Sequence, residues 1–73
     1  MNPALEEAAR LYDAAAAELD LATRHCEVSA KHFRNGEVPR GAAHAWAALG
    51  HIREAEERLD SQARTHAGRS TVD

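Results

Sequence analysis

Two helix-favouring segments meet at the residues Asn35-Gly36-Glu37-Val38-Pro39. Glycine adopts the left-handed backbone conformation that ends many helices, and proline is well tolerated at the first position of a new helix. No glycine or proline interrupts the chain between Ala4 and Arg34. The sequence therefore predicts two long helices joined by a short turn, which makes them antiparallel neighbours.

The outer ends of both helices are also marked. Asn2 is a good helix cap, Pro3 suits the first helical position, and Gly68 is a stop signal for the second helix. No alternating strand pattern is present, so the expected fold class is all-α. The expected boundaries are helices over about residues 3–35 and 39–67, a hairpin domain over residues 1–68 and a flexible tail over residues 69–73.

The core of such a hairpin is small. The chain has 73 residues, aromatic residues are only 4% of it, and alanine supplies much of the 44% hydrophobic content. A single core in a chain of this size rarely contributes more than ~3–5 kcal/mol, so small chains commonly rely on staples or partners. One cysteine, Cys26, cannot form a disulfide within the chain. We therefore expect a partner surface to complete the fold.

The charge pattern argues against two classes of partner. The formal net charge is −3, and lysine and arginine do not cluster. Binding to nucleic acid or to an anionic membrane surface depends on clustered cations, so neither partner is expected. The sequence also lacks the apolar run of a membrane-spanning helix and the pattern of a secretory signal. The expected location is the cytoplasm.

Helical spacing sorts the apolar residues of each helix into two neighbouring stripes. We predict that the first stripe joins the two helices and forms the core within the chain. Its larger members, together with the one cysteine, are Leu19, Cys26, Phe33, Leu49, Ile52 and Leu59.

The second stripe is predicted to form an interface with another molecule, because a lone hairpin covers one stripe per helix. The simplest cover is a second copy of the chain, which gives a homodimeric four-helix bundle; the alternative is a different protein. The residues expected at this interface are Leu11, Leu21, Val28, Ala48 and Ala55.

Four of the five histidines form two pairs seven residues apart, His25 with His32 and His44 with His51. Folding the hairpin about Val38 places His25 level with His51 and His32 level with His44. Imidazole nitrogens suit transition metals such as zinc. Together, His25, His51 and Glu54, which lies one helical turn from His51, would offer two imidazoles and a carboxylate to a metal ion.

The spacing also limits this hypothesis. Seven residues separate histidines on one helix by ~10.5 Å, so all four cannot bind a single ion. The simpler interpretation is a set of half-buried interface histidines without a cofactor. A third possibility is pH sensing, because clustered imidazoles repel one another once they are charged.

The same folding about Val38 places Cys26 level with Gly50. A close approach of the two backbones there would explain a glycine inside a helix, where it costs ~1 kcal/mol relative to alanine. Cys26 itself is expected to act as a small apolar filler.

No side chains have the spacing of a nucleophile with its base, so we expect no enzymatic activity. The sequence favours a small helical interaction or scaffold module that binds through apolar helix faces. The alternative is a metal-binding or metal-sensing helical bundle that uses the paired histidines.

Overall fold

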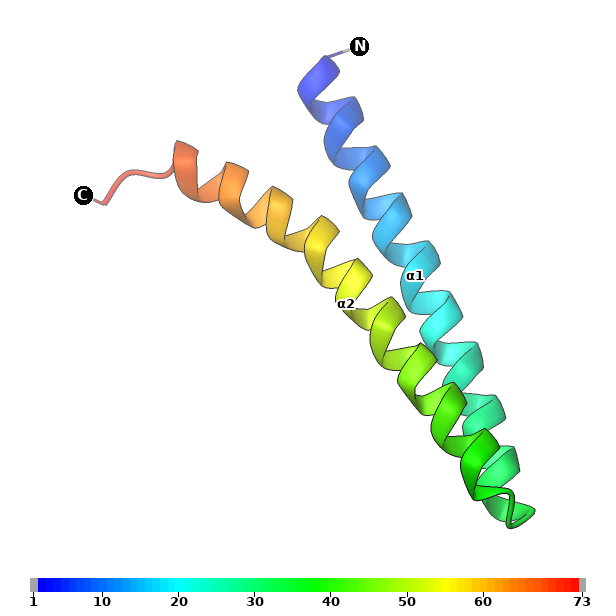
Figure 1. Cartoon of the computed structure of the whole chain (residues 1–73). Coiled ribbons are helices and arrows are strands. Elements are labelled where there is room, and N and C mark those ends of the chain that lie inside the picture. The colour runs from blue at the N-terminus through cyan, green and yellow to red at the C-terminus, as the bar shows by residue number, and fades with distance from the viewer. Residues whose placement is uncertain (1, 73) are drawn as a thin grey trace.

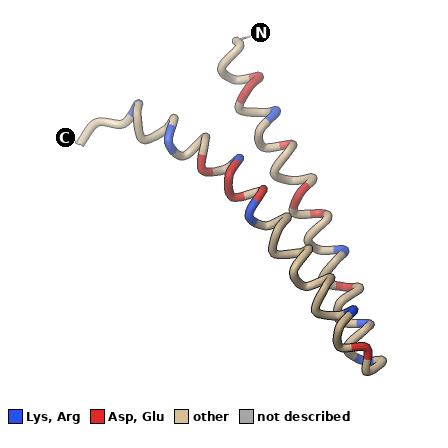
Figure 2. The backbone as a smooth tube through the Cα atoms, in the orientation of Figure 1, with Lys and Arg blue, Asp and Glu red and all other residues tan. Residues whose placement is uncertain are grey.

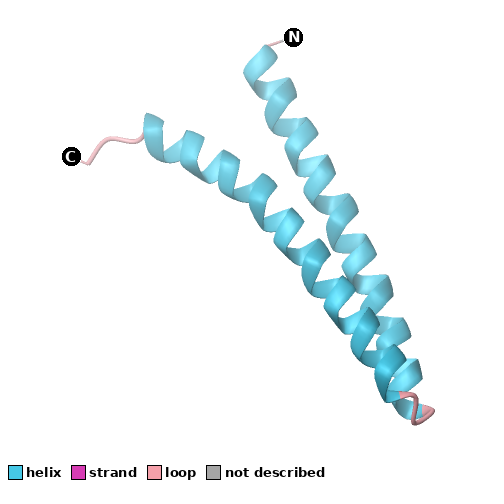
Figure 3. Cartoon of the chain, in the orientation of Figure 1, coloured by secondary structure: helices cyan, strands magenta, loops and turns pink. Residues whose placement is uncertain are grey.

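The structure, a computed structural model, describes residues 2–72 and consists of two helices folded into a hairpin (Figure 1). Helix α1 spans Pro3–Arg34 and helix α2 spans Val38–Arg69. Within the described residues all regular structure is helical, as Figure 3 shows. The expectation of an all-α antiparallel hairpin is therefore confirmed. Helix α2 continues through Gly68, which was expected to end it.

The turn follows from the sequence as expected. Gly36 has a φ of +74°, the left-handed conformation that ends α1. The amide of Glu37 donates to the carbonyl of His32 at 2.8 Å, and the amide of Gly36 donates to the carbonyl of Phe33 at 3.0 Å. These bonds satisfy carbonyls that the last turn of a helix would otherwise leave without partners.

The two helices meet along residues that are mostly very small. On each helix the buried residues recur every seven positions, which is the spacing of an antiparallel coiled coil. We call this set the small-residue seam. Its members are Ala15, Ala22 and Ser29 on α1, and Gly41, Ala48 and Ala55 on α2.

One contact fixes the register of the seam. The hydroxyl of Ser29 donates to the carbonyl of Gly41 at 2.7 Å, so a side chain of α1 touches the backbone of α2. Steps of seven residues from this contact bring Ala22 level with Ala48. A glycine and small side chains on both helices permit such a close approach.

The large residues that were predicted to form the core are not buried, and on α2 the predicted stripe itself is wrong. Leu19, Phe33 and Leu59 are each more than 40% exposed, and Cys26 is exposed as well. The other two predicted core residues, Leu49 and Ile52, are half-buried. Helices that approach as closely as Ser29 and Gly41 require leave no room for leucine or phenylalanine between them. The large side chains therefore lie along the edge of the contact.

The hairpin is thin and elongated. Its extents are 54 × 30 × 13 Å, and the smallest of these is about the diameter of one helix. The radius of gyration is 16.8 Å, whereas a compact chain of this length would have about 11 Å. The helices lie together near the turn and diverge towards the termini (Figure 1). Both broad sides of this single layer are consequently open.

The close approach lies at Gly41 and not at Gly50, where the sequence had suggested it. A Cβ atom on Gly41 would lie 2.6 Å from two ring carbons of Phe33, whereas one on Gly50 would meet nothing within 4 Å. Gly50 therefore has no packing role within the chain.

Replacing each glycine by alanine tests this difference. Gly50→Ala is expected to stabilise the hairpin by about 1 kcal/mol, because alanine favours the helix and its methyl group meets no obstacle. Gly41→Ala is expected to gain clearly less, since the Phe33 ring has to move. Urea denaturation of both variants measures the two changes. Equal stabilisation by both substitutions would contradict the seam described here.

Candidate functional site

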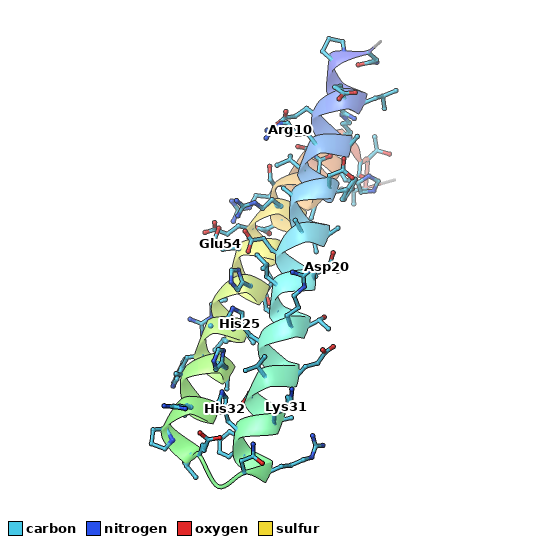
Figure 4. All side chains as sticks on the ribbon, turned by 90° about the vertical axis from the view of Figure 1, so that its right-hand side faces the viewer. Arg10, Asp20, His25, Lys31, His32 and Glu54 are labelled. Carbon is cyan, nitrogen blue, oxygen red and sulfur yellow. The ribbon has the colours of Figure 1, made fainter. Side chains whose placement is uncertain are left out.

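Four half-buried histidines form a continuous row along the contact between the helices. The order is His32, His44, His25 and His51, so the rings come alternately from α1 and α2. Successive ring centroids lie 5.4, 5.2 and 5.5 Å apart. We call these four residues the histidine row; Figure 4 shows His25 and His32 between the two ribbons.

The two inner histidines are hydrogen-bonded to each other. Nδ1 of His25 lies 2.9 Å from Nδ1 of His44. A bond between two imidazole nitrogens needs a proton on one nitrogen and a lone pair on the other. The inner pair therefore holds one proton between its two Nδ1 atoms.

Each outer histidine bonds to a glutamate. Nδ1 of His51 lies 2.6 Å from Oε2 of Glu18, and Nδ1 of His32 lies 3.3 Å from Oε1 of Glu37. An ionised carboxylate only accepts hydrogen bonds, so each outer imidazole donates from Nδ1. A glutamate carboxylate therefore lies at each end of the row.

The heptad spacing of the sequence builds this row. Glu18, His25 and His32 are seven residues apart on α1, and each follows a position of the small-residue seam by three residues. Glu37 and the two histidines of α2 share the equivalent spacing. Since the seam residues are small, the helices come close enough for rings from opposite helices to alternate.

The predicted pairing of histidines across the two helices is correct in part. His25 stacks on His51, and His32 stacks on His44, as folding about Val38 had suggested. The bond between His25 and His44 was not predicted, and it joins the two levels into one row.

The carboxylate next to His51 is Glu18 and not Glu54. Glu54 instead accepts hydrogen bonds from Arg58, one turn along the same helix. That hydrogen bond is the main reason why the pKa of Arg58 is raised, and the charges of Glu18 and Glu57 add to it. The sequence held the signal for Glu18, because it precedes His25 by one heptad.

One nitrogen of every ring in the row is occupied within the protein. Each of the four Nδ1 atoms already bonds to another side chain. Over residues 2–72, no three side chains among histidine, cysteine, aspartate and glutamate are grouped so that they could hold a metal ion.

Two residues of the predicted interface are buried inside the hairpin. Ala48 and Ala55 are 3% and 1% exposed and belong to the small-residue seam. Leu11 and Val28 are half-buried, and Leu21 is 38% exposed. The seam lies on the stripe of α2 that was expected to face a partner, so a different stripe of that helix is left uncovered.

The uncovered stripe forms an apolar face on one broad side of the hairpin. It combines residues of both helices that flank the seam on the same side, because equivalent flanks of antiparallel helices are adjacent. We call this set the apolar face. Its members are Tyr12, Leu19, Cys26 and Phe33 on α1, and Ala42, Ala45, Trp46, Leu49, Ile52 and Leu59 on α2; the same spacing also places the charged Glu56 between Ile52 and Leu59.

A shallow hollow marks the end of the apolar face nearest the turn. Its volume is about 340 Å³, and its lining joins Phe33 of α1 to residues 42–49 of α2. Trp46 stands at this hollow and is 71% exposed. Figure 2 shows that α2 carries no lysine, arginine, aspartate or glutamate between Arg40 and Arg53, so the hollow lies in a region without these charged residues.

Comparisons with protein families, with curated proteins and with solved structures found no match to this chain. Neither described helix combines the length and the apolar character that crossing a lipid bilayer requires.

A double-mutant cycle tests the position of Glu18. Combining Glu18→Gln with His51→Asn is expected to give a coupling free energy of about 1 kcal/mol, because the two side chains are hydrogen-bonded and half-buried. The matched cycle of Glu54→Gln with His51→Asn is expected to give a value near zero. Urea denaturation of the single and double variants at neutral pH measures both. A larger coupling through Glu54 would show that the site is assembled differently.

Proposed function

We propose that this chain is a small helical interaction module that associates with a second copy of itself through the apolar face. The observation that carries the proposal is the position of the large side chains. No large side chain among residues 2–72 is fully buried, while Leu19, Phe33 and Trp46 are each at least 44% exposed. Burial of large apolar side chains is the dominant stabilising contribution in folded proteins, and this hairpin lacks it.

The exposed area supports the same proposal. The hairpin exposes 5602 Å², whereas a compact chain of this mass would expose about 4,400 Å². The excess of about 1,200 Å² is more than the ~800 Å² that each partner buries in a standard interface. One hairpin therefore exposes enough surface for a second copy to cover. Pairing the same face of both copies gives a closed two-fold dimer.

The contents of the apolar face suit an interface. Trp46 is the residue type that most often dominates binding energy when it enters an apolar pocket, and the hollow beside it is lined by apolar residues. In a two-fold pairing, the face of each copy offers both a tryptophan and a hollow. Four helices would then surround a core built from the large side chains that each hairpin leaves outside.

Two leucines of α1 provide a matched test. Leu19 belongs to the apolar face and is 44% exposed, whereas Leu21 is 38% exposed and lies on the opposite flank of the seam. Leu19→Asp is expected to shift the chain from dimer to monomer at micromolar concentration, because a charge would be buried at the interface. Leu21→Asp is expected to leave the dimer intact. Sedimentation equilibrium measures both masses, and circular dichroism verifies helix content.

A monomeric wild-type chain, or a Leu19→Asp variant that keeps the dimer mass, would overturn this proposal. Dissociation by Leu21→Asp alone would assign the interface to the opposite flank. If Leu19→Asp fails to fold, Trp46→Ala replaces it, because a side chain that is 71% exposed contributes little to the hairpin itself.

A further inference from the structure

We propose that the histidine row is a proton-operated latch that holds the hairpin closed near neutral pH and releases it in mild acid. The row lies in the one contact that joins α1 to α2, and its four imidazoles follow one another at 5.2–5.5 Å. Imidazole is the side chain that ordinarily changes its charge between about pH 5 and 8. The inference concerns opening within one chain and does not depend on self-association.

The inner pair limits how many protons the closed row can hold. With both rings neutral, His25 and His44 share one Nδ1 proton at an N···N distance of 2.9 Å. A proton added at a free Nε2 leaves that bond intact, because one Nδ1 still offers a lone pair. A second added proton makes both Nδ1 atoms donors, so the bond is lost and two cations face each other.

The outer histidines respond to protonation in the opposite way. Protonated His51 and His32 each remain bonded to a carboxylate, that of Glu18 or that of Glu37, as an ion pair. Protons taken up at the two ends of the row therefore do not open the hairpin. Acid release begins only when the inner pair becomes doubly charged.

The other charged groups near the row do not neutralise the inner pair. Glu37 is shared with Arg40, whose Nη1 lies 3.2 Å from it. At the opposite end, Arg58 is paired with Glu54 and also feels the charge of Glu18. A fully protonated row therefore places four positive imidazoles beside two carboxylates that arginines already partly compensate.

The small-residue seam offers little apolar burial to resist this repulsion. The positions that alternate with the row hold only alanine, serine and glycine, which bury little surface. If the closed hairpin binds a given proton tenfold more weakly than the open one does, binding of that proton shifts the equilibrium about tenfold towards the open hairpin. Opening would separate the two helices and divide the apolar face, since that face includes residues of both.

Energy transfer within one chain tests the latch. Trp46 and Cys26 are the only tryptophan and the only cysteine, they lie on different helices, and both are exposed. An acceptor dye on Cys26 therefore reports on the distance between α1 and α2. The labelled chain is diluted into excess unlabelled chain carrying Trp46→Phe and Cys26→Ser, so that transfer between copies is not observed.

Transfer is expected to fall between about pH 7.5 and 5, while circular dichroism shows that both helices remain. His44→Gln is expected to remove this fall, or to reduce the opening constant at pH 5 about tenfold, because an amide cannot become the second cation of the inner pair. His66→Gln is the matched control: His66 is exposed and lies outside the row, so the fall is expected to persist.

Three results would overturn the latch. They are transfer that stays constant over this pH range, an equal effect of His44→Gln and His66→Gln, and a pH response in His44→Gln that is as large as that of the wild-type chain. If His44→Gln does not fold at neutral pH, His25→Gln replaces it, because it removes the other inner imidazole with the same expected result.

Discussion

The distance between α1 and α2 depends on the small-residue seam, and the other features of the hairpin follow from that distance. The hydroxyl of Ser29 reaches the backbone carbonyl of Gly41 at 2.7 Å, and alanines occupy the equivalent positions further along both helices. At such a separation, large side chains do not fit between the helices. They remain along the edges of the contact, where they are exposed or half-buried.

Two consequences follow from the same close packing. Imidazoles from opposite helices interleave into the histidine row, in which each Nδ1 atom has a hydrogen-bonding partner. Several large apolar residues, among them Leu19, Phe33 and Trp46, gather on one broad side as the apolar face. The row lies inside the hairpin and responds to protons, whereas the face lies outside it and suits a partner. Our two proposals therefore arise from different parts of one arrangement.

The sequence was sufficient to predict the hairpin, but not to predict which residues bring its two helices into contact. Glycine at position 36 and proline at position 39 mark the turn, because both act through local backbone geometry. Which stripe joins the helices depends on how closely the helices approach each other. The hydrophobicity of the residues does not determine that distance. Choosing the more apolar stripe of α2 therefore misplaced the core on that helix. The heptad spacing of the histidines was visible, but their joining into one row with Glu18 depends on the register that the seam sets.

Methyl contacts in solution test the seam most directly. In a sample with labelled alanine, leucine and isoleucine methyl groups, nuclear Overhauser effects are expected between Ala22 and Ala48, because the register places them level across the contact. The same effects are expected between Ala15 and Ala55, both of which are buried. If these effects are absent, and contacts within one chain instead join Leu19 to Ile52, the helices meet through their large side chains. The seam, the row and the apolar face would then all be assigned wrongly.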